Sequence, residues 1–320
     1  MPYPTALPSM HDFPAGRQRT LKSAIGCVGI GLHSGLRTTM RLLPAAADNG
    51  IAFRRTDLGI DIPAQFDHVI DTRLSTVLGI PGGDPAARVG TVEHLMAAFA
   101  AFGIDNAVVE IDGPELPAFD GSASSFAFLI ECAGRQVQNA PRRVIEVLRP
   151  VRVGTADGYA ELLPSTGEGL DLSLCIDFAA AAIGRQELAL TLNESSFRRE
   201  LAEARTFAMA GEIAQLQAAG LARGGSLDNA VVVDDAMVLN PGGLRMKDEF
   251  VRHKLTDAVG DLALAGAALK ARFRAHRTGH ALNNQLLRAL FADGANWRLS
   301  APVRMGSSSA QRLPAAASPV

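Results

Sequence analysis

The sequence has few of the features that mark secreted, membrane or nucleic-acid-binding proteins. Only three cysteines occur among 320 residues, Cys27, Cys132 and Cys175. Their odd number and scattered positions do not form a disulfide framework or a C-x-x-C metal site. The formal net charge of -2 gives no electrostatic reason to bind nucleic acid or an anionic membrane surface. We therefore expect no nucleic-acid partner.

Long apolar runs are also missing. Residues 1–20 contain prolines and polar residues where a signal peptide would have an apolar core, and no segment is long enough to cross a bilayer. The hydrophobic content of 48% and the charged content of 20% are ordinary for a soluble globular protein, and the length favours about two domains. We expect a cytoplasmic monomer without a transmembrane segment.

Among the features that are present, residues 248–262 are the most informative. Their apolar positions recur at helical spacing and predict a helix with one face on a core. His253, Asp257 and Asp261 follow one another at intervals of four and form a polar line beside that face. Side chains four apart on a helix lie close enough for an imidazole and a carboxylate to hold one metal ion. The apolar positions are Val251, Leu255, Ala258 and Leu262.

Two interpretations of this helix remain open at this point. A His-x-x-x-Asp pair is common on solvated helix faces, where it makes a simple hydrogen bond. A catalytic zinc ion, in contrast, needs a third protein ligand, and the rest of the chain has to supply it.

A second helix is predicted over residues 91–100. Val92, Leu95, Ala98 and Phe99 form its apolar face. Thr91 is the expected N-cap, which places Glu93 and His94 in the first turn. Helix capping would explain Glu93, and a lone histidine is usually structural. The pair becomes a candidate base and third ligand only in combination with residues 248–262.

The remaining elements indicate an α+β protein of two domains. A polar, proline-containing stretch at 139–143 separates two halves that each combine strands with helices. We expect domains at 19–140 and 141–305, and disordered tails at 1–18 and 306–320. The expected strands of the second half include 144–153, 159–163, 170–178 and 187–192, and the expected last helix covers 282–290.

Several separated motifs, taken together, closely resemble one family, the UDP-3-O-acyl-N-acetylglucosamine deacetylases. These are zinc amidases that commit a sugar nucleotide to lipid A synthesis in Gram-negative bacteria. The resemblance extends from about residue 20 to 300. The motifs are Gly29 to Gly35, Thr91 to Ala98, Leu116 to Ser122, Ala204 to Phe207, Gly224 to Ser226, Val232 to Asp235, Asp248 to Leu262 and Gly279 to Asn284.

The resemblance implies a role for each residue of the active site. The family's three zinc ligands correspond to His94, His253 and Asp257, with a fourth position left for water. Glu93 corresponds to the general base and His280 to the catalytic histidine. The other catalytic residues that the resemblance implies are Asp261, which orients His280, Thr206, which stabilises the oxyanion, and Lys254, a basic residue near the substrate.

The resemblance also implies where an acylated UDP-sugar would bind. A strand–helix–strand insert, expected at about 206–233, would form an apolar tunnel for the fatty acyl chain. The chain departs from the family pattern at Ala179 and Ala180, where relatives often have His-Pro, and Arg223 is an unexpected charge in the insert. The candidate substrate-binding residues are Phe178, Phe207, Ile213, Leu227, Ala230 and Arg277.

The implied architecture is two similar two-layer sandwiches with the helices packed between the sheets and the active site at the domain junction. Two alternatives to the deacetylase remain. One is a zinc amidohydrolase of another N-acetylated sugar, which loss of the acyl tunnel would favour. The other is a non-catalytic protein that binds sugar nucleotides or acyl chains, which loss of the base or of a ligand would favour.

Overall fold

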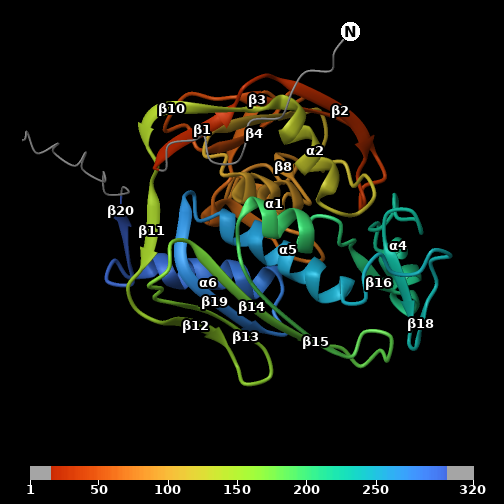
Figure 1. Ribbon diagram of the computed structural model, residues 1–320. Coiled ribbons are helices and arrows are strands. Elements are labelled where there is room, and N and C mark those ends of the chain that lie inside the picture. Colours follow the sequence, from red (N-terminus) through yellow and green to blue (C-terminus); the bar gives the residue numbers. More distant parts are fainter. Residues whose placement is uncertain (1–15, 301–320) are drawn as a thin grey trace, which may run out of the picture.

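The computed structural model describes residues 16–300 (Figure 1). The expected tail at 306–320 and most of that at 1–18 lie outside the described residues. The first strand, β1 (Arg17–Leu21), pairs with β10 (Arg135–Pro141). The expectation of a tail up to residue 18 was therefore wrong for its last two residues, because this strand already pairs at Arg17.

The N-terminal half is built on a five-stranded sheet in the order β2-β3-β9-β4-β5. All neighbouring strands are antiparallel except β4 and β9, which are parallel. Alternate residues of β3 (Thr38, Met40 and Leu42) are fully buried, as expected for a sheet with one face on the core. The strand bounds are β2 Ile25–Ile30, β3 Arg37–Pro44, β4 Ile51–Arg55, β5 Ile60–Pro63 and β9 Ala107–Ile111. A small second sheet contains β6 Val69–Asp71, β7 Val77–Gly79 and β8 Arg88–Val89, preceded by the 3-10 turn η1 Phe66–His68.

The C-terminal half is built on a seven-stranded sheet. Strand β19 is central, because it pairs with β13, β14 and β11. The strand bounds are β11 Val144–Val147, β12 Val151–Gly154, β13 Tyr159–Leu163, β14 Leu170–Asp177, β15 Arg185–Thr191, β19 Ala268–His276 and β20 Trp297–Ser300.

The two large sheets share one strand arrangement. In the second sheet, β12, β13, β19, β14 and β15 pair in the same order and with the same directions as β2, β3, β9, β4 and β5 in the first. The central strand of each sheet follows a long helix: β9 follows α1, and β19 follows α5. This correspondence confirms the expectation of two similar α+β units, although no repeat is visible in the sequence.

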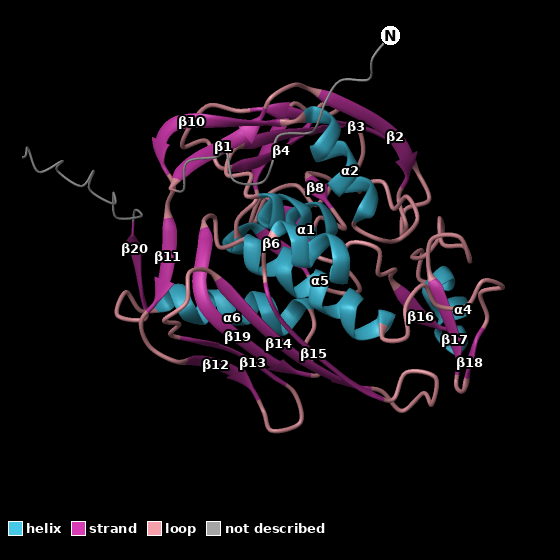
Figure 2. Ribbon diagram, in the orientation of Figure 1, coloured by secondary structure: helices cyan, strands magenta, loops and turns pink. Residues whose placement is uncertain are grey.

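The main helices lie between the two sheets. Helices α1 (Glu93–Phe102) and α5 (Glu249–Ala263) pack against each other there, flanked by α2 (Ser124–Ala133) and α6 (His280–Ala292) (Figures 1 and 2). Among residues 16–300, no helix combines the length and the apolar content that a membrane crossing requires.

A third, smaller unit projects from the side of the second half (Figure 1). It consists of the strand β16 (Phe207–Met209), helix α4 (Ala210–Ala218) and strands β17 (Val231–Asp234) and β18 (Met237–Val238). Strands β16 and β17 are parallel, as a strand–helix–strand crossover requires. A short helix, α3 (Glu194–Ser196), and a π-helical turn, η2 (Phe197–Leu201), precede this unit.

Three local predictions need correction. Thr91 is not an N-cap: the cap position is Val92 without a side-chain hydrogen bond, and the Thr91 hydroxyl donates to Glu115 at 3.0 Å. The strand expected at 144–153 is interrupted after Val147, because Pro150 has no N–H for a ladder. The last helix begins at His280 rather than at residue 282.

The approach of α1 to α5 depends on one glycine. A Cβ built on Gly260 of α5 would lie 1.9 Å from the carbonyl oxygen of Glu93, at the start of α1. This is far inside van der Waals contact, and the opposing atom is backbone, which cannot rotate away. Only glycine at this position lets the two helices pack as they do.

We predict that Gly260→Ala lowers the free energy of unfolding by about 1–3 kcal/mol or more, because the added methyl group forces the helices apart. Urea denaturation measures the change. Gly294→Ala is the matched control, since a Cβ there meets no atom within 4 Å; it should change stability by less than about 0.5 kcal/mol. Equal stability of the two variants would contradict the close-contact argument.

Candidate active site

Two histidines and one carboxylate converge where α1 meets α5. The Nε2 atoms of His94 and His253 lie 3.4 Å and 3.3 Å from Oδ1 of Asp257. The two imidazole rings are perpendicular, with centroids 5.0 Å apart. All three side chains are buried, and one ligand atom from each lies within 4.8 Å of the others, so this group could hold a metal ion.

Burial and charge set the protonation of this group. Burial lowers the pKa of His253 to about 4, so its ring is neutral near pH 7. Its Nδ1 lies 3.2 Å from the Ala204 carbonyl oxygen, which only accepts, so Nδ1 carries the hydrogen and the lone pair of Nε2 faces the group. Burial opposes the ionised form of Asp257, but the neighbouring His253 and Lys254 hold its pKa well below the ordinary value.

Lys254 occupies the other oxygen of this carboxylate. Its Nζ donates to Asp257 Oδ2 at 3.1 Å, which leaves Oδ1 to the two histidines. Burial alone would lower the pKa of Lys254, but the charge of Asp257 raises it above its usual value, so the amine stays protonated.

A second group of titratable side chains adjoins the first. Nε2 of His280, at the start of α6, lies 3.9 Å from Glu93 Oε1 and 4.0 Å from Asp257 Oδ2. On the other side of the ring, Nδ1 lies 2.9 Å from Asp261 Oδ2. These contacts bring the predicted residues Glu93, Asp261 and His280 together. Glu93, Asp257 and His280 form a second set that could hold a metal ion, and it shares Asp257 with the first.

The environment moves the pKa values of Glu93 and His280 in the same direction for different reasons. Burial raises the pKa of Glu93 to about 7, against the opposing charges of His280 and His94. Burial opposes the charged form of His280, but the carboxylates of Asp261, Glu93 and Asp257 outweigh it and raise the pKa of His280 to about 9. Between about pH 7 and 9, therefore, an ionised Glu93 faces a protonated His280.

Two residues of this group were not predicted. Thr76, just before β7, donates its hydroxyl to Asp261 Oδ1 at 2.5 Å, and Asn283 donates its amide to Asp261 Oδ2 at 2.8 Å. The Asn283 contact follows from helix spacing, because Asn283 lies one turn after His280. No sequence pattern indicates Thr76, because its hydrogen-bond partner Asp261 is 185 positions away.

A buried ion pair between Arg205 and Glu249 fixes the position of the segment that carries Thr206. Glu249, fully buried at the start of α5, accepts hydrogen bonds from the backbone and guanidinium of Arg205 and from the backbone of Arg245. Thr206 is partly buried, and its N–H donates to the Gly121 carbonyl at 2.8 Å. The segment that ends at Thr206 therefore joins α5 to the first half of the chain.

Aromatic side chains connect the metal group to the projecting unit. The ring of Phe207 contacts those of Phe178, Phe250 and His253, with centroids 5.5, 5.0 and 6.1 Å apart. The candidate residue Phe207 thus lies beside the metal group, and the candidate residue Phe178 contacts Phe207. Arg277 is exposed at the turn before α6, with a left-handed φ of 49°.

Strand β17 of the projecting unit is buried, but its helix and connecting loop are not. Helix α4 has no buried residue; Ile213 and Ala230 are partly buried, and Leu227 is 42% exposed. Arg223 is exposed, so its charge points away from the interior. The backbone of Arg223 and Gly224 donates to the carbonyls of His33 and Leu32, which attaches the unit to the first half.

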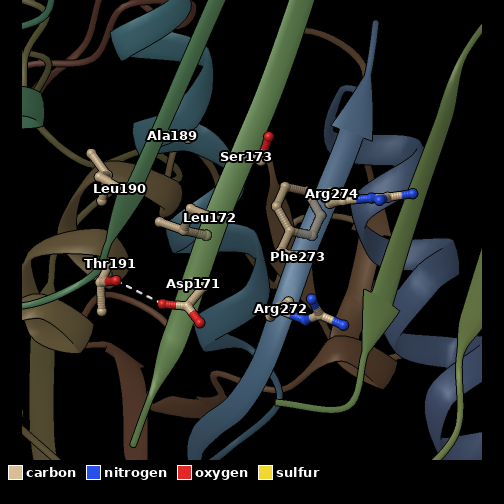
Figure 3. Close-up of a pocket in the computed structure, with 9 residues that line it drawn as sticks. All are labelled: Asp171, Leu172, Ser173, Ala189, Leu190, Thr191, Arg272, Phe273 and Arg274. Carbon is tan, nitrogen blue, oxygen red and sulfur yellow. Dashed lines mark hydrogen bonds between the residues drawn. The ribbon is translucent and has the colours of Figure 1, made fainter. Parts of the chain in front are cut away.

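A separate hollow of about 380 Å³ lies on β14, β15 and β19 and contains none of the predicted site residues (Figure 3). Several of its polar groups are already paired: the Thr191 hydroxyl donates to Asp171 at 2.6 Å (Figure 3), and Arg274 pairs with Glu161. No cluster of titratable groups comparable to that between α1 and α5 faces this hollow in the described structure. We therefore assign the chemistry to the helix junction.

Comparison with known proteins identifies the family. Residues 18–292 match the family model described as UDP-3-O-acyl N-acetylglycosamine deacetylase. A protein named UDP-3-O-acyl-N-acetylglucosamine deacetylase from Acidithiobacillus ferrooxidans is 50% identical over 285 residues, which cover 88% of this chain and 92% of the relative. A protein of the same name from Photobacterium profundum is 47% identical over 87% of this chain and 91% of the relative. Another, from an Anaeromyxobacter species, is 48% identical over 86% of this chain and 89% of the relative. The chain belongs to the UDP-3-O-acyl N-acetylglycosamine deacetylase family.

Proposed function

We propose that this chain hydrolyses the acetamide of a 3-O-acylated UDP-N-acetylglucosamine, the step that commits the sugar nucleotide to lipid A synthesis. The products are acetate and the free 2-amine. The observation that carries the proposal is the junction of α1 and α5, where an acid–base pair, Glu93 and His280, lies beside a potential metal group, with His280 Nε2 4.0 Å from Asp257 Oδ2. The family match and the relatives' names support the same reaction.

The first group suits zinc. Ligand atoms about 2.0–2.1 Å from a tetrahedral ion lie about 3.3–3.4 Å from one another. The contacts of His94 and His253 with Asp257 measure 3.4 and 3.3 Å. Two imidazole nitrogens and one carboxylate oxygen, with one position open, are a donor set typical of catalytic zinc. A zinc ion bound there would supply Lewis acidity, which makes water a better nucleophile and polarises the acetamide carbonyl.

The chain's own residues would then move the protons. Glu93 accepts a proton from the attacking water, whose oxygen bonds to the carbonyl carbon. His280 donates a proton to the nitrogen as the C–N bond breaks, because an amine leaves poorly unless it is protonated. Asp261 holds His280 at Nδ1, so that Nε2 faces the reacting groups. Thr206 would stabilise the oxyanion through its hydroxyl.

Substrate recognition would involve three regions. Lys254 and Arg277 are the basic groups that we assign to the diphosphate side. Phe207 contacts His253 of the metal group and Phe178 contacts Phe207, and these contacts support our assignment of both rings to the sugar and its acyl chain. Ile213, Leu227 and Ala230 are the proposed lining of the acyl tunnel, and their incomplete burial leaves apolar surface for the chain.

Substitution of ligand and base should separate metal binding from turnover. Asp257→Ala should lose bound zinc on dialysis, because one of three ligands and its charge are removed. Glu93→Ala should keep zinc and lose turnover by roughly 10²- to 10⁴-fold. Atomic absorption and acetate release measure the two effects. Full zinc content in Asp257→Ala, or normal turnover in Glu93→Ala, would contradict the assigned roles.

The pH dependence should follow the acid–base pair. We predict that kcat/KM rises through about pH 7 as Glu93 ionises and falls through about pH 9 as His280 loses its proton. His280→Gln should remove the alkaline limb and keep the acidic one. Rates of acetate release between pH 5 and 10 give the profile. An unchanged alkaline limb in His280→Gln would assign that ionisation to another group.

The substrate tests the proposed function most directly. Zinc-loaded protein should release acetate from a 3-O-acylated UDP-N-acetylglucosamine and far more slowly from the unacylated sugar. Equal release from both would indicate a zinc amidohydrolase of another N-acetylated sugar. Release from neither, with zinc bound, would indicate a protein that binds the sugar nucleotide or the acyl chain without catalysis.

A further inference from the structure

Thr76 contacts both members of the acid–base pair, Glu93 and His280. Its N–H donates to Glu93 Oε2 at 3.0 Å, and its hydroxyl donates to Asp261 Oδ1 at 2.5 Å. The same hydroxyl oxygen lies 3.2 Å from His280 Nδ1. The residue is 2% exposed, so water does not compete for these bonds.

These contacts leave the reacting atoms free. Asp261 Oδ2 accepts from His280 and Asn283, and Thr76 takes Oδ1, so the carboxylate cannot turn without losing a buried hydrogen bond. In Glu93, Thr76 fixes Oε2 and leaves Oε1 facing His280 Nε2 at 3.9 Å. Thr76 therefore holds each carboxylate through the oxygen that faces away from His280, which is Oε2 in Glu93 and Oδ1 in Asp261.

Thr76 is itself fixed to the start of α1. Its carbonyl accepts from the backbone N–H of Val92 at 3.3 Å, and its own N–H donates to the side chain of Glu93, so both backbone groups of residue 76 are bonded to residues 92 and 93. Glu93 belongs to the first half of the chain, whereas Asp261 and His280 belong to the second. Thr76 thus links the two halves within the site, because its backbone binds Glu93 and its hydroxyl binds Asp261.

We propose that Thr76 is a positioning residue, which fixes the approach of Glu93 to His280 by holding one oxygen of Glu93 and one of Asp261. This inference rests on the proposed function, in which Glu93 and His280 transfer the protons. Thr76 touches neither of the atoms that transfer them, Oε1 and Nε2. It acts through the residues that carry them.

The kinetic test uses zinc-loaded protein and three variants. Thr76→Val removes the hydroxyl at nearly constant volume and should lower kcat by roughly 10- to 100-fold, with KM and zinc content within about twofold. Thr76→Ser keeps the hydroxyl and should retain kcat within about threefold. Thr20→Val is the matched control, because Thr20 is also buried and donates to the Asn106 carbonyl, outside the site. It should leave kcat unchanged. A kcat within twofold in Thr76→Val, or an equal loss in Thr20→Val, would overturn the proposal.

A double-mutant cycle separates positioning from general destabilisation. In a His280→Ala background, Thr76→Val should lower kcat by less than about a further twofold, since the residue through which Thr76 acts is gone. A double variant whose kcat loss equals the product of the two single losses would show that the residues act independently and would overturn the proposal. Thr76→Ala substitutes for Thr76→Val if the valine variant does not fold.

A spectroscopic measurement makes the test independent of activity. In metal-free protein, ¹⁵N NMR of the imidazoles detects the His280 Nδ1 proton, assigned by its absence in His280→Ala. This proton should exchange with solvent at least about tenfold faster in Thr76→Val than in wild type and Thr76→Ser, because Asp261 loses a hydrogen bond that fixes it. Equal exchange would overturn the proposal even if acetate release failed, whereas faster exchange without acetate release would refute only the proposed function.

Discussion

The site depends on the close contact of α1 with α5. Gly260 allows the backbone of Glu93 to approach α5 more closely than any side chain would permit. This approach places His94 of α1 within 3.4 Å of Asp257 on α5, one turn before Asp261. The duplicated sheets explain why these helices meet, since each helix precedes the central strand of its own sheet. The site is therefore a product of how two similar units pack, and neither unit contains it alone.

The same contact buries many charges, which the fold stabilises by pairing them. Isolated buried charges are costly, whereas charges with hydrogen-bonded partners are tolerated. Asp257 faces two histidines and Lys254, and Asp261 accepts from three side chains. Glu93 is the exception, because its Oε1 faces His280 only at 3.9 Å. Burial therefore raises its pKa to about 7, because the charges of His280 and His94 only partly offset it, and this value suits Glu93 to exchange a proton near neutral pH.

Helical periodicity predicted much of the second unit's contribution from the sequence. The spacing of His253, Asp257 and Asp261 requires only a regular helix, and the structure places them on one line of α5. The contribution of α1 could not be derived in this way, because contacts between distant elements leave no periodic signal, and the family resemblance was needed. Thr76 was missed for the same reason. The local errors, at Thr91 and Pro150, occur where a long-range hydrogen bond or a missing N–H overrides a local pattern.

The position of the metal tests this account most directly, because two groups of side chains share Asp257. Anomalous diffraction at the zinc absorption edge, from crystals of zinc-loaded protein, locates the ion. The account predicts one site within about 2.0–2.2 Å of His94, His253 and Asp257, with Glu93 and His280 left free to transfer protons. An ion bound instead by Glu93, Asp257 and His280 would remove both the base and the acid and would contradict the account.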